Sequence, residues 1–227
     1  MNVLEILPIA ILGAVCGLDF VSFPQAMISR PIVGATAGGA ITGSAPEGLL
    51  IGVVLELLAL DTRPFGASRY PEWGTAGVTG GAVFAAIGGA RPGALPTAVF
   101  VSLVTAMISG SSMVGLRKVI GARASATRDL IESGSDRAVV GLQLFGLTAD
   151  LARGFLLTLV AVSLALPLAG GMVQIWGLPA TFSNAAVIGL AGAVAGGSIW
   201  KFFTAGTRTG WLFLAGLVIG LGFVAVQ

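Results

Sequence analysis

Long apolar stretches with few charged residues fill most of this 227-residue chain. Residues 92–116 carry no charge, and residues 138–168 carry only Asp150 and Arg153. About 20 apolar residues in a row suffice for a helix to cross the hydrocarbon core of a bilayer. The pattern therefore predicts an all-α polytopic membrane protein.

The composition excludes most other classes of protein. Charged residues make up 10% of the chain, whereas soluble globular domains carry about 25%. A chain with so few charges cannot cover a water-soluble globule, which argues against a soluble enzyme, a disordered protein or a nucleic-acid-binding protein. Histidine is absent and Cys16 is the only cysteine. We therefore expect no internal disulfide, no metal site and no cofactor.

The apolar stretches give an approximate map of the membrane-embedded elements within a single membrane domain, residues 1–227. The N-terminal segment continues from Glu5 into an apolar run that extends to about Phe23; it lacks the basic start of a signal peptide and predicts a retained first span. Residues 31–46 and 48–60 are each too short for an easy span, whereas residues 73–90 are long enough. Residues 170–200 are divided at Pro179, and residues 209–227 close the chain. This map predicts six to eight hydrophobic elements, including a re-entrant hairpin or broken helices.

One hydrophilic stretch, residues 117–137, separates the two longest apolar regions. It holds five of the twelve basic residues: Arg117, Lys118, Arg123, Arg128 and Arg137. Short basic segments between spans stay in the cytoplasm, so we expect a cytoplasmic loop of a protein in the bacterial inner membrane. The same loop is a candidate docking surface for a soluble partner. Arg128 and Glu132 have the spacing of an i,i+4 pair on a short helix.

Charged side chains inside apolar stretches cost about 2.5–3.5 kcal/mol at a helix centre, so each needs an explanation. Asp150 and Arg153 lie one helical turn apart and can neutralise each other. Asp19 lies near the end of the first span and can reach interfacial water. Glu56 has no basic residue nearby in the sequence, and it therefore needs a cavity, a substrate, a coupling proton or a distant arginine.

Polar residues gather on both sides of Glu56, around a corner rich in glycine, proline and serine at residues 43–48. Two short apolar arms joined by such a corner are typical of the discontinuous helices that hold substrates in transporters. A carboxylate in a watery cavity can accept hydrogen bonds from sugar hydroxyls. The candidate substrate site consists of Gln25, Ser29, Arg30, Glu56, Asp61 and Arg63.

Residues 25–72 resemble the signature region of the membrane subunit IIC of the mannose/fructose/sorbose-type sugar phosphotransferase system. The shared features include Arg30-Pro31, the 48–52 run GLLIG, Leu55-Glu56 and Pro71-Glu72. The resemblance implies a sugar permease rather than an enzyme. It also implies a IID membrane subunit, a trimer of IIC–IID pairs, and soluble IIA and IIB proteins. In that family, phosphate travels from phosphoenolpyruvate to the sugar on histidines of IIA and IIB.

The chain departs from the family pattern at Ser44, Asp61 and Arg63, where an acid, a glycine and an uncharged residue are usual. A non-transporting regulatory relic of the permease is therefore a second hypothesis. A third is the substrate-capturing membrane subunit of an ATP-driven importer. No Walker A motif occurs in the sequence, so neither hypothesis places ATP hydrolysis on this chain.

Overall fold

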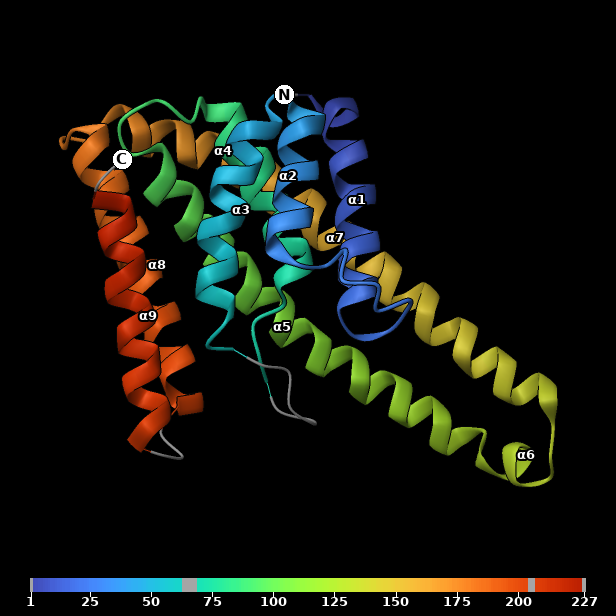
Figure 1. The fold of residues 1–227 in the computed structure, drawn as a ribbon. Helices are drawn as coiled ribbons and strands as arrows, with labels where there is room; N and C mark the ends of the chain where they lie inside the picture. Colours follow the sequence, from blue (N-terminus) through green and yellow to red (C-terminus); the bar gives the residue numbers. More distant parts are fainter. Residues whose placement is uncertain (1, 63–68, 204–206, 226–227) are drawn as a thin grey trace.

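The computed structural model describes residues 2–62, 69–203 and 207–225, and within them every regular element is a helix. Figure 1 shows an upright group of helices from which a long helical hairpin projects. The helices are α1 (Val3–Val21), α2 (Pro31–Thr42), α3 (Ala45–Ala59), α4 (Trp73–Ile87), α5 (Ala94–Ala126), α6 (Arg128–Glu132), α7 (Asp136–Gln174), α8 (Ala180–Phe203) and α9 (Thr207–Ala225). By length and composition, α1, α5, α7 and α8 can each cross a membrane. These features confirm the predicted all-α polytopic membrane protein.

Helices α2 and α3 form the predicted hairpin. They have 12 and 15 residues, too few to cross a hydrocarbon core about 30 Å thick. Pro31 opens α2 at a position where its missing amide hydrogen costs nothing, and Gly43 ends α2 with a φ of 107°. Gly39 and Gly48 let the two backbones touch, because a side chain on either would overlap the other helix. The hairpin therefore follows from its glycine and proline positions.

Helix α4 is shorter than the full span that residues 73–90 predicted. It ends at Ile87, because Gly88 adopts a φ of 77° that stops the helix. Thirteen of its 15 residues are buried, and it packs against α1, α2, α3, α5 and α7. It is therefore the central helix of the fold.

The hydrophilic stretch 117–137 is largely helical rather than a loop. Helix α5 continues through it as far as Ala126, α6 follows, and α7 begins at Asp136. With 33 residues α5 is about 50 Å long, longer than a bilayer core is thick. We call residues 117–147 the arm; Figure 1 shows it projecting from the body with α6 at its tip. The predicted Arg128–Glu132 pair is confirmed at 2.7 Å.

The helices define two ends of the molecule, visible in Figure 1. The arm end carries α6, segment 22–30 and the last turn of α3. The far end carries the start of α1 and the turns that join α2 to α3, α4 to α5, and α7 to α8. Segment 22–30 and the beginning of α4 therefore lie at the arm end, where the candidate site is found.

Candidate functional site

Segment 22–30, which connects α1 to α2, is folded around the carboxylate of Asp19. The backbone amides of Ala26 and Ser29 donate hydrogen bonds of 2.6 and 2.9 Å to its two oxygens. Asp19 is only 1% exposed, so the expectation that it reaches interfacial water is wrong. Its role in the structure is to fix the segment that carries Gln25, Ser29 and Arg30.

A cavity of about 360 Å³ lies between this segment, the end of α3 and the beginning of α4. It brings together three of the residues predicted from the sequence, Gln25, Ser29 and Arg30. Its lining consists of Asp19, Phe20, Gln25, Met27, Ser29, Arg30, Pro31, Ala59, Thr62 and Trp73. The polar groups thus share the cavity with two aromatic rings, a combination suited to a polyhydroxylated ligand.

Glu56 finds its partner across the hairpin. One carboxylate oxygen forms an ion pair with the guanidinium of Arg30, and the other accepts a 3.3 Å hydrogen bond from the amide of Ile32. The Arg30 side chain is 48% exposed and that of Glu56 is 18% exposed. Of the partners expected for Glu56, the structure shows the distant arginine. Arg30 lines the cavity, whereas Glu56 is not among the lining residues and is connected to the cavity through this ion pair.

Asp61 does not join this group. Its carboxylate accepts hydrogen bonds from Lys201 Nζ at 2.5 Å and from Ser198 Oγ at 3.0 Å, both on α8. The hydrogen bond from Lys201, with that from Ser198, lowers the pKa of Asp61 below its ordinary value. The structure therefore places Asp61 in a tie between the end of α3 and α8. Arg63, the sixth predicted residue, lies outside the described residues.

Sequence reasoning did not assign the other seven lining residues to the site, among them Phe20, Thr62 and Trp73. The indole Nε1 of Trp73 donates a 2.8 Å hydrogen bond to Thr62 Oγ1, which holds the ring at the cavity wall. An aromatic ring offers an apolar face against which a sugar ring can pack. The position of Trp73 directly after Pro71-Glu72 was the signal available in the sequence.

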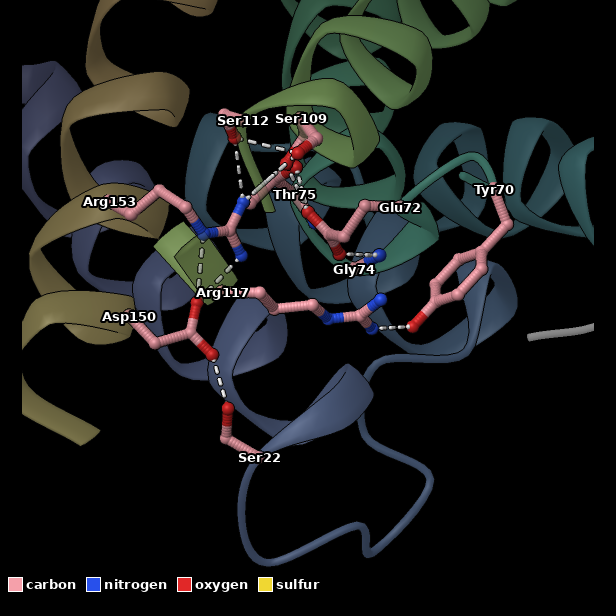
Figure 2. A network of polar contacts seen from close by, with 10 residues as sticks. All are labelled: Ser22, Tyr70, Glu72, Gly74, Thr75, Ser109, Ser112, Arg117, Asp150 and Arg153. Carbon is pink, nitrogen blue, oxygen red and sulfur yellow. Dashed lines mark hydrogen bonds and ion pairs between the residues drawn. The ribbon is translucent and has the colours of Figure 1, made fainter. Parts of the chain in front are cut away.

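Behind the cavity, Glu72 is fully buried and caps the first turn of α4 (Figure 2). Its carboxylate accepts hydrogen bonds from the amides of Gly74 (2.6 Å) and Thr75 (3.1 Å) and from the hydroxyls of Thr75 (2.5 Å) and Ser109 (2.6 Å). Four donors offset the cost of burying a carboxylate. Glu72 thereby fixes the neighbouring residue, Trp73.

The network continues from Ser109 to α7, as Figure 2 shows. Arg153 Nη1 donates to Ser109 Oγ at 2.9 Å, and Arg153 pairs with Asp150 at 2.8 Å. This confirms the predicted Asp150–Arg153 pair. Asp150 in turn accepts a 2.5 Å hydrogen bond from Ser22, where segment 22–30 begins. One network therefore anchors both walls of the cavity to α5 and α7.

A second contact joins the arm to the cavity. Arg117 donates a hydrogen bond to the hydroxyl of Tyr70, and its guanidinium lies 5.4 Å from the centre of the Tyr70 ring. The Tyr70 ring in turn packs against Phe20, with 5.8 Å between ring centres. The base of the arm is thus in contact, through Tyr70, with a residue that lines the cavity. Within the described ranges, no cluster of three or more carboxylate or thiol side chains is placed to hold a metal ion.

Comparisons with known proteins agree with this picture. Two solved structures match the whole chain, each over 93% of its own length and at 16% sequence identity. One is described as "Structure of membrane protein" and has a TM-score of 0.75. The other is the cryo-electron-microscopy structure of the mannose transporter ManYZ in complex with microcin E492, with a TM-score of 0.63. At such low identity these matches show the fold alone. No curated protein sequence matches the chain. The family model described as "PTS system sorbose-specific iic component" matches residues 3–176. Because this match covers well over half of the chain, the protein belongs to the sorbose-specific IIC family of the phosphotransferase system.

Proposed function

We propose that the chain is the IIC sugar permease subunit of a phosphoenolpyruvate-dependent, mannose-type phosphotransferase system in a bacterial inner membrane. It binds a sugar, carries it across the membrane and presents it to a IIB protein for phosphorylation. The observation that carries the proposal is the cavity at the end of the α2–α3 hairpin, where Gln25, Ser29 and Arg30 face the same space as Trp73. Family membership supports a transport subunit rather than an enzyme.

The Arg30–Glu56 pair gives the proposed site its chemistry. A guanidinium donates hydrogen bonds and a carboxylate accepts them, so together they satisfy the hydroxyl groups of a sugar. Gln25 and Ser29 add neutral polar groups, and Trp73 supplies an apolar face. Arg30 and Glu56 neutralise each other while the site is empty, and sugar hydroxyls then share this pair. The chain itself binds and orients the sugar, and the phosphoryl group passes from the IIB protein to the sugar without being carried on this chain.

The partners follow from the same proposal. A IID membrane subunit joins the chain, as pairs that assemble into a trimer, and soluble IIA and IIB proteins carry the phosphate. The basic arm is the proposed contact for the soluble carrier, because it projects from the end at which the cavity lies. The structural similarity to the mannose transporter ManYZ supports a sugar-transporting assembly.

Replacing Glu56 by glutamine tests the sugar site. Glu56→Gln keeps the shape but removes the charge, so the subunits should still assemble while sugar binding falls about tenfold or more, since one charge-assisted hydrogen bond exceeds about 1.4 kcal/mol. Sugar affinity of the purified complex, measured by calorimetry with a panel of hexoses and hexitols, provides the readout. Glu47→Gln is the matched control: Glu47 lies at the other end of α3 and accepts a hydrogen bond from the amide of Gly89, which glutamine can also accept.

Two results would count against this assignment. If Glu56→Gln binds sugar normally but fails to assemble, the pair with Arg30 is structural and the site lies elsewhere. If the assembled wild-type complex binds none of the sugars, the regulatory relic is the better hypothesis. The family assignment already favours the permease over the subunit of an ATP-driven importer.

Cysteine labelling tests the orientation of the arm. Ser125→Cys in a Cys16→Ser background places one thiol on the exposed arm, and Ala90→Cys places one in the exposed turn at the far end. We expect an impermeant maleimide added to intact cells to label Cys at position 90 and to spare position 125. The reverse pattern would place the arm outside the cytoplasm and exclude it as the docking surface for a soluble carrier.

A further inference from the structure

A second cavity, of about 790 Å³, lies at the far end of the molecule, between the beginning of α1, the end of α4 and the second half of α7. Its polar lining comes from Asn2, Arg91 and Ser163, and its apolar lining includes Ile6, Leu166 and Pro167. None of these residues belongs to the proposed sugar site. The cavity therefore needs an explanation of its own.

Arg91 stands apart from the other basic residues of the described chain. The arm carries five of them, Arg30 pairs with Glu56 and Lys201 pairs with Asp61, whereas Arg91 lies in the turn between α4 and α5. Basic residues on the side opposite the basic loops work against the charge bias that orients a membrane protein. Arg91 is exposed and donates a 3.4 Å hydrogen bond to the carbonyl of Ile87, and among the described residues it forms no ion pair with a carboxylate. Its guanidinium is therefore available to an anion.

Other polar groups face the same space. The side-chain oxygen Oδ1 of Asn2 accepts a hydrogen bond from the backbone amide of Glu5. The side-chain NH₂ group of Asn2, which lines the cavity, is then a second donor beside Arg91. Pro167 has no amide hydrogen, so the carbonyl of Ser163, four residues earlier in α7, lacks its helical partner. The cavity thus offers a cation and an amide donor together with a freed carbonyl and a hydroxyl at Ser163.

The cavity borders a surface suited to lipid. Leu156, Val160, Leu164 and Leu168 form a stripe along α7, and their exposed fractions run from 53% to 65%. This stripe adjoins Ser163 and Pro167. A ligand in the cavity can therefore have its polar part at the far end of α7 and its apolar part along the hydrocarbon layer. A free sugar has no apolar part of this kind and does not require a cation.

We propose that this cavity binds an anionic phospholipid, with its phosphate on Arg91 and Asn2. The unpaired carbonyl and the hydroxyl of Ser163 suit a headgroup hydroxyl, such as those of phosphatidylglycerol, and one acyl chain lies against Ile6 and Leu166. The site lies in the membrane leaflet opposite the arm. This inference goes beyond the proposed function and does not depend on which sugar is carried.

Lipid retention by the purified assembly tests the proposal. The complex of this chain with its membrane partner is reconstituted in nanodiscs of phosphatidylcholine with a minor share of phosphatidylglycerol, and the bound lipids are counted by native mass spectrometry. We expect wild type to retain phosphatidylglycerol preferentially. Arg91→Ala should reduce that preference about tenfold, as expected for loss of a charge-assisted contact worth over about 1.4 kcal/mol. Arg91→Lys should retain part of it, because lysine keeps the charge without the planar fork.

The control is Arg137→Ala, which removes an exposed basic residue from the arm and should leave retention unchanged. Equal retention by wild type and Arg91→Ala would overturn the proposal. Displacement of the bound phosphatidylglycerol by added sugar would also overturn the proposal, because the cavity would then be an entrance for sugar. If the wild-type assembly retains no phosphatidylglycerol in preference to phosphatidylcholine, the proposal is also overturned, because the partner subunit then fills the cavity. None of these outcomes bears on Glu56, so failure here is distinct from failure of the proposed function.

Discussion

Two groups of glycine-rich apolar helices, α2 with α4 and α8 with α9, use their glycines differently. A methyl group on Gly81 of α4 would overlap the carbonyl of Ala35 on α2, and one on Gly38 of α2 would overlap the carbonyl of Val78 on α4. In α8, methyl groups on Gly192, Gly196 or their neighbouring glycines would meet no atom within 4 Å. Similar composition thus gives closed packing in one region and open space beside the glycines in the other.

The difference shows which part of the chain completes its own packing. Helix α4 is enclosed by its neighbours, and its polar residues at the start are satisfied by the network around Glu72. Helix α9, in contrast, exposes Leu212 by 71% and Ile219 by 72%. Because apolar side chains on a membrane protein are covered by lipid or by other subunits, we expect the open surface of α8 and α9 to face one of these. The contact between α2 and α4 is a part whose geometry the chain sets alone.

Gly81→Ala tests this contrast with the largest expected effect. The added methyl group would collide with backbone on α2, which cannot turn away as a side chain can, so α2 and α4 must separate. We expect a large loss of folded, monodisperse protein in detergent and a clearly lower melting temperature. Fluorescence-detected size-exclusion chromatography with a heating step measures both.

Gly196→Ala is the matched control, because it adds the same methyl group to α8 where nothing lies within 4 Å. Alanine also favours helix over glycine, so this variant should melt at the same temperature as wild type or slightly above it. Equal destabilisation by the two substitutions would contradict the proposed contrast between closed and open packing. A loss of partner subunit from Gly196→Ala alone would show that this open surface of α8 is an interface.

Glu72→Ala should have the next largest effect. The substitution leaves the buried amides of Gly74 and Thr75 without their acceptor and removes the link through Ser109 to Arg153. Unsatisfied buried donors and a lost helix cap together cost about 2–4 kcal/mol. Glu132→Ala, which breaks the exposed pair with Arg128, should cost at most about 1 kcal/mol. Thermal unfolding in detergent compares them, and similar shifts for the two variants would show that the buried network does not hold the fold together.

The hairpin and the charge pair on α7 were predictable from the sequence because their signals are local. Pro31, Gly43 and Pro46 mark helix ends by their backbone preferences, and these preferences hold in any surroundings. Asp150 and Arg153 are one helical turn apart, so their pairing follows from helix geometry. Gln25, Ser29 and Arg30 share a cavity for a similar reason, since they lie within one short connecting segment.

The remaining features depend on contacts between distant parts of the chain. Asp61 bonds to Ser198 and Lys201, which lie more than 130 residues further along the chain. No pattern near Asp61 in the sequence indicates these two partners. The importance of Glu72 depends on Ser109, which reaches it from another helix. The sequence predicts a loop for residues 117–137 because they are hydrophilic, yet hydrophilic residues also form helices that project beyond a membrane. The composition of a segment indicates whether it lies in water or in the membrane more reliably than it indicates whether the segment is a helix or a loop.

The ion pair between Asp61 and Lys201 connects the end of α3 to α8. Breaking it should lower the melting temperature less than Gly81→Ala or Glu72→Ala does. Asp61 and Lys201 are 45% and 69% exposed, so the pair is well hydrated and contributes little. The hydrogen bond from Lys201 lowers the pKa of Asp61 from its ordinary value of 3.8. The tie therefore stabilises the protein above pH 3.8 and is lost as the pH falls through the lowered value.

Asp61→Asn should melt slightly below wild type at neutral pH, and the gap should close in acid, where the wild-type carboxylate is protonated. A gap that stays the same in acid would show that the charge of Asp61 does not contribute, and that α8 is held to α3 by apolar packing and by the hydroxyl of Ser198.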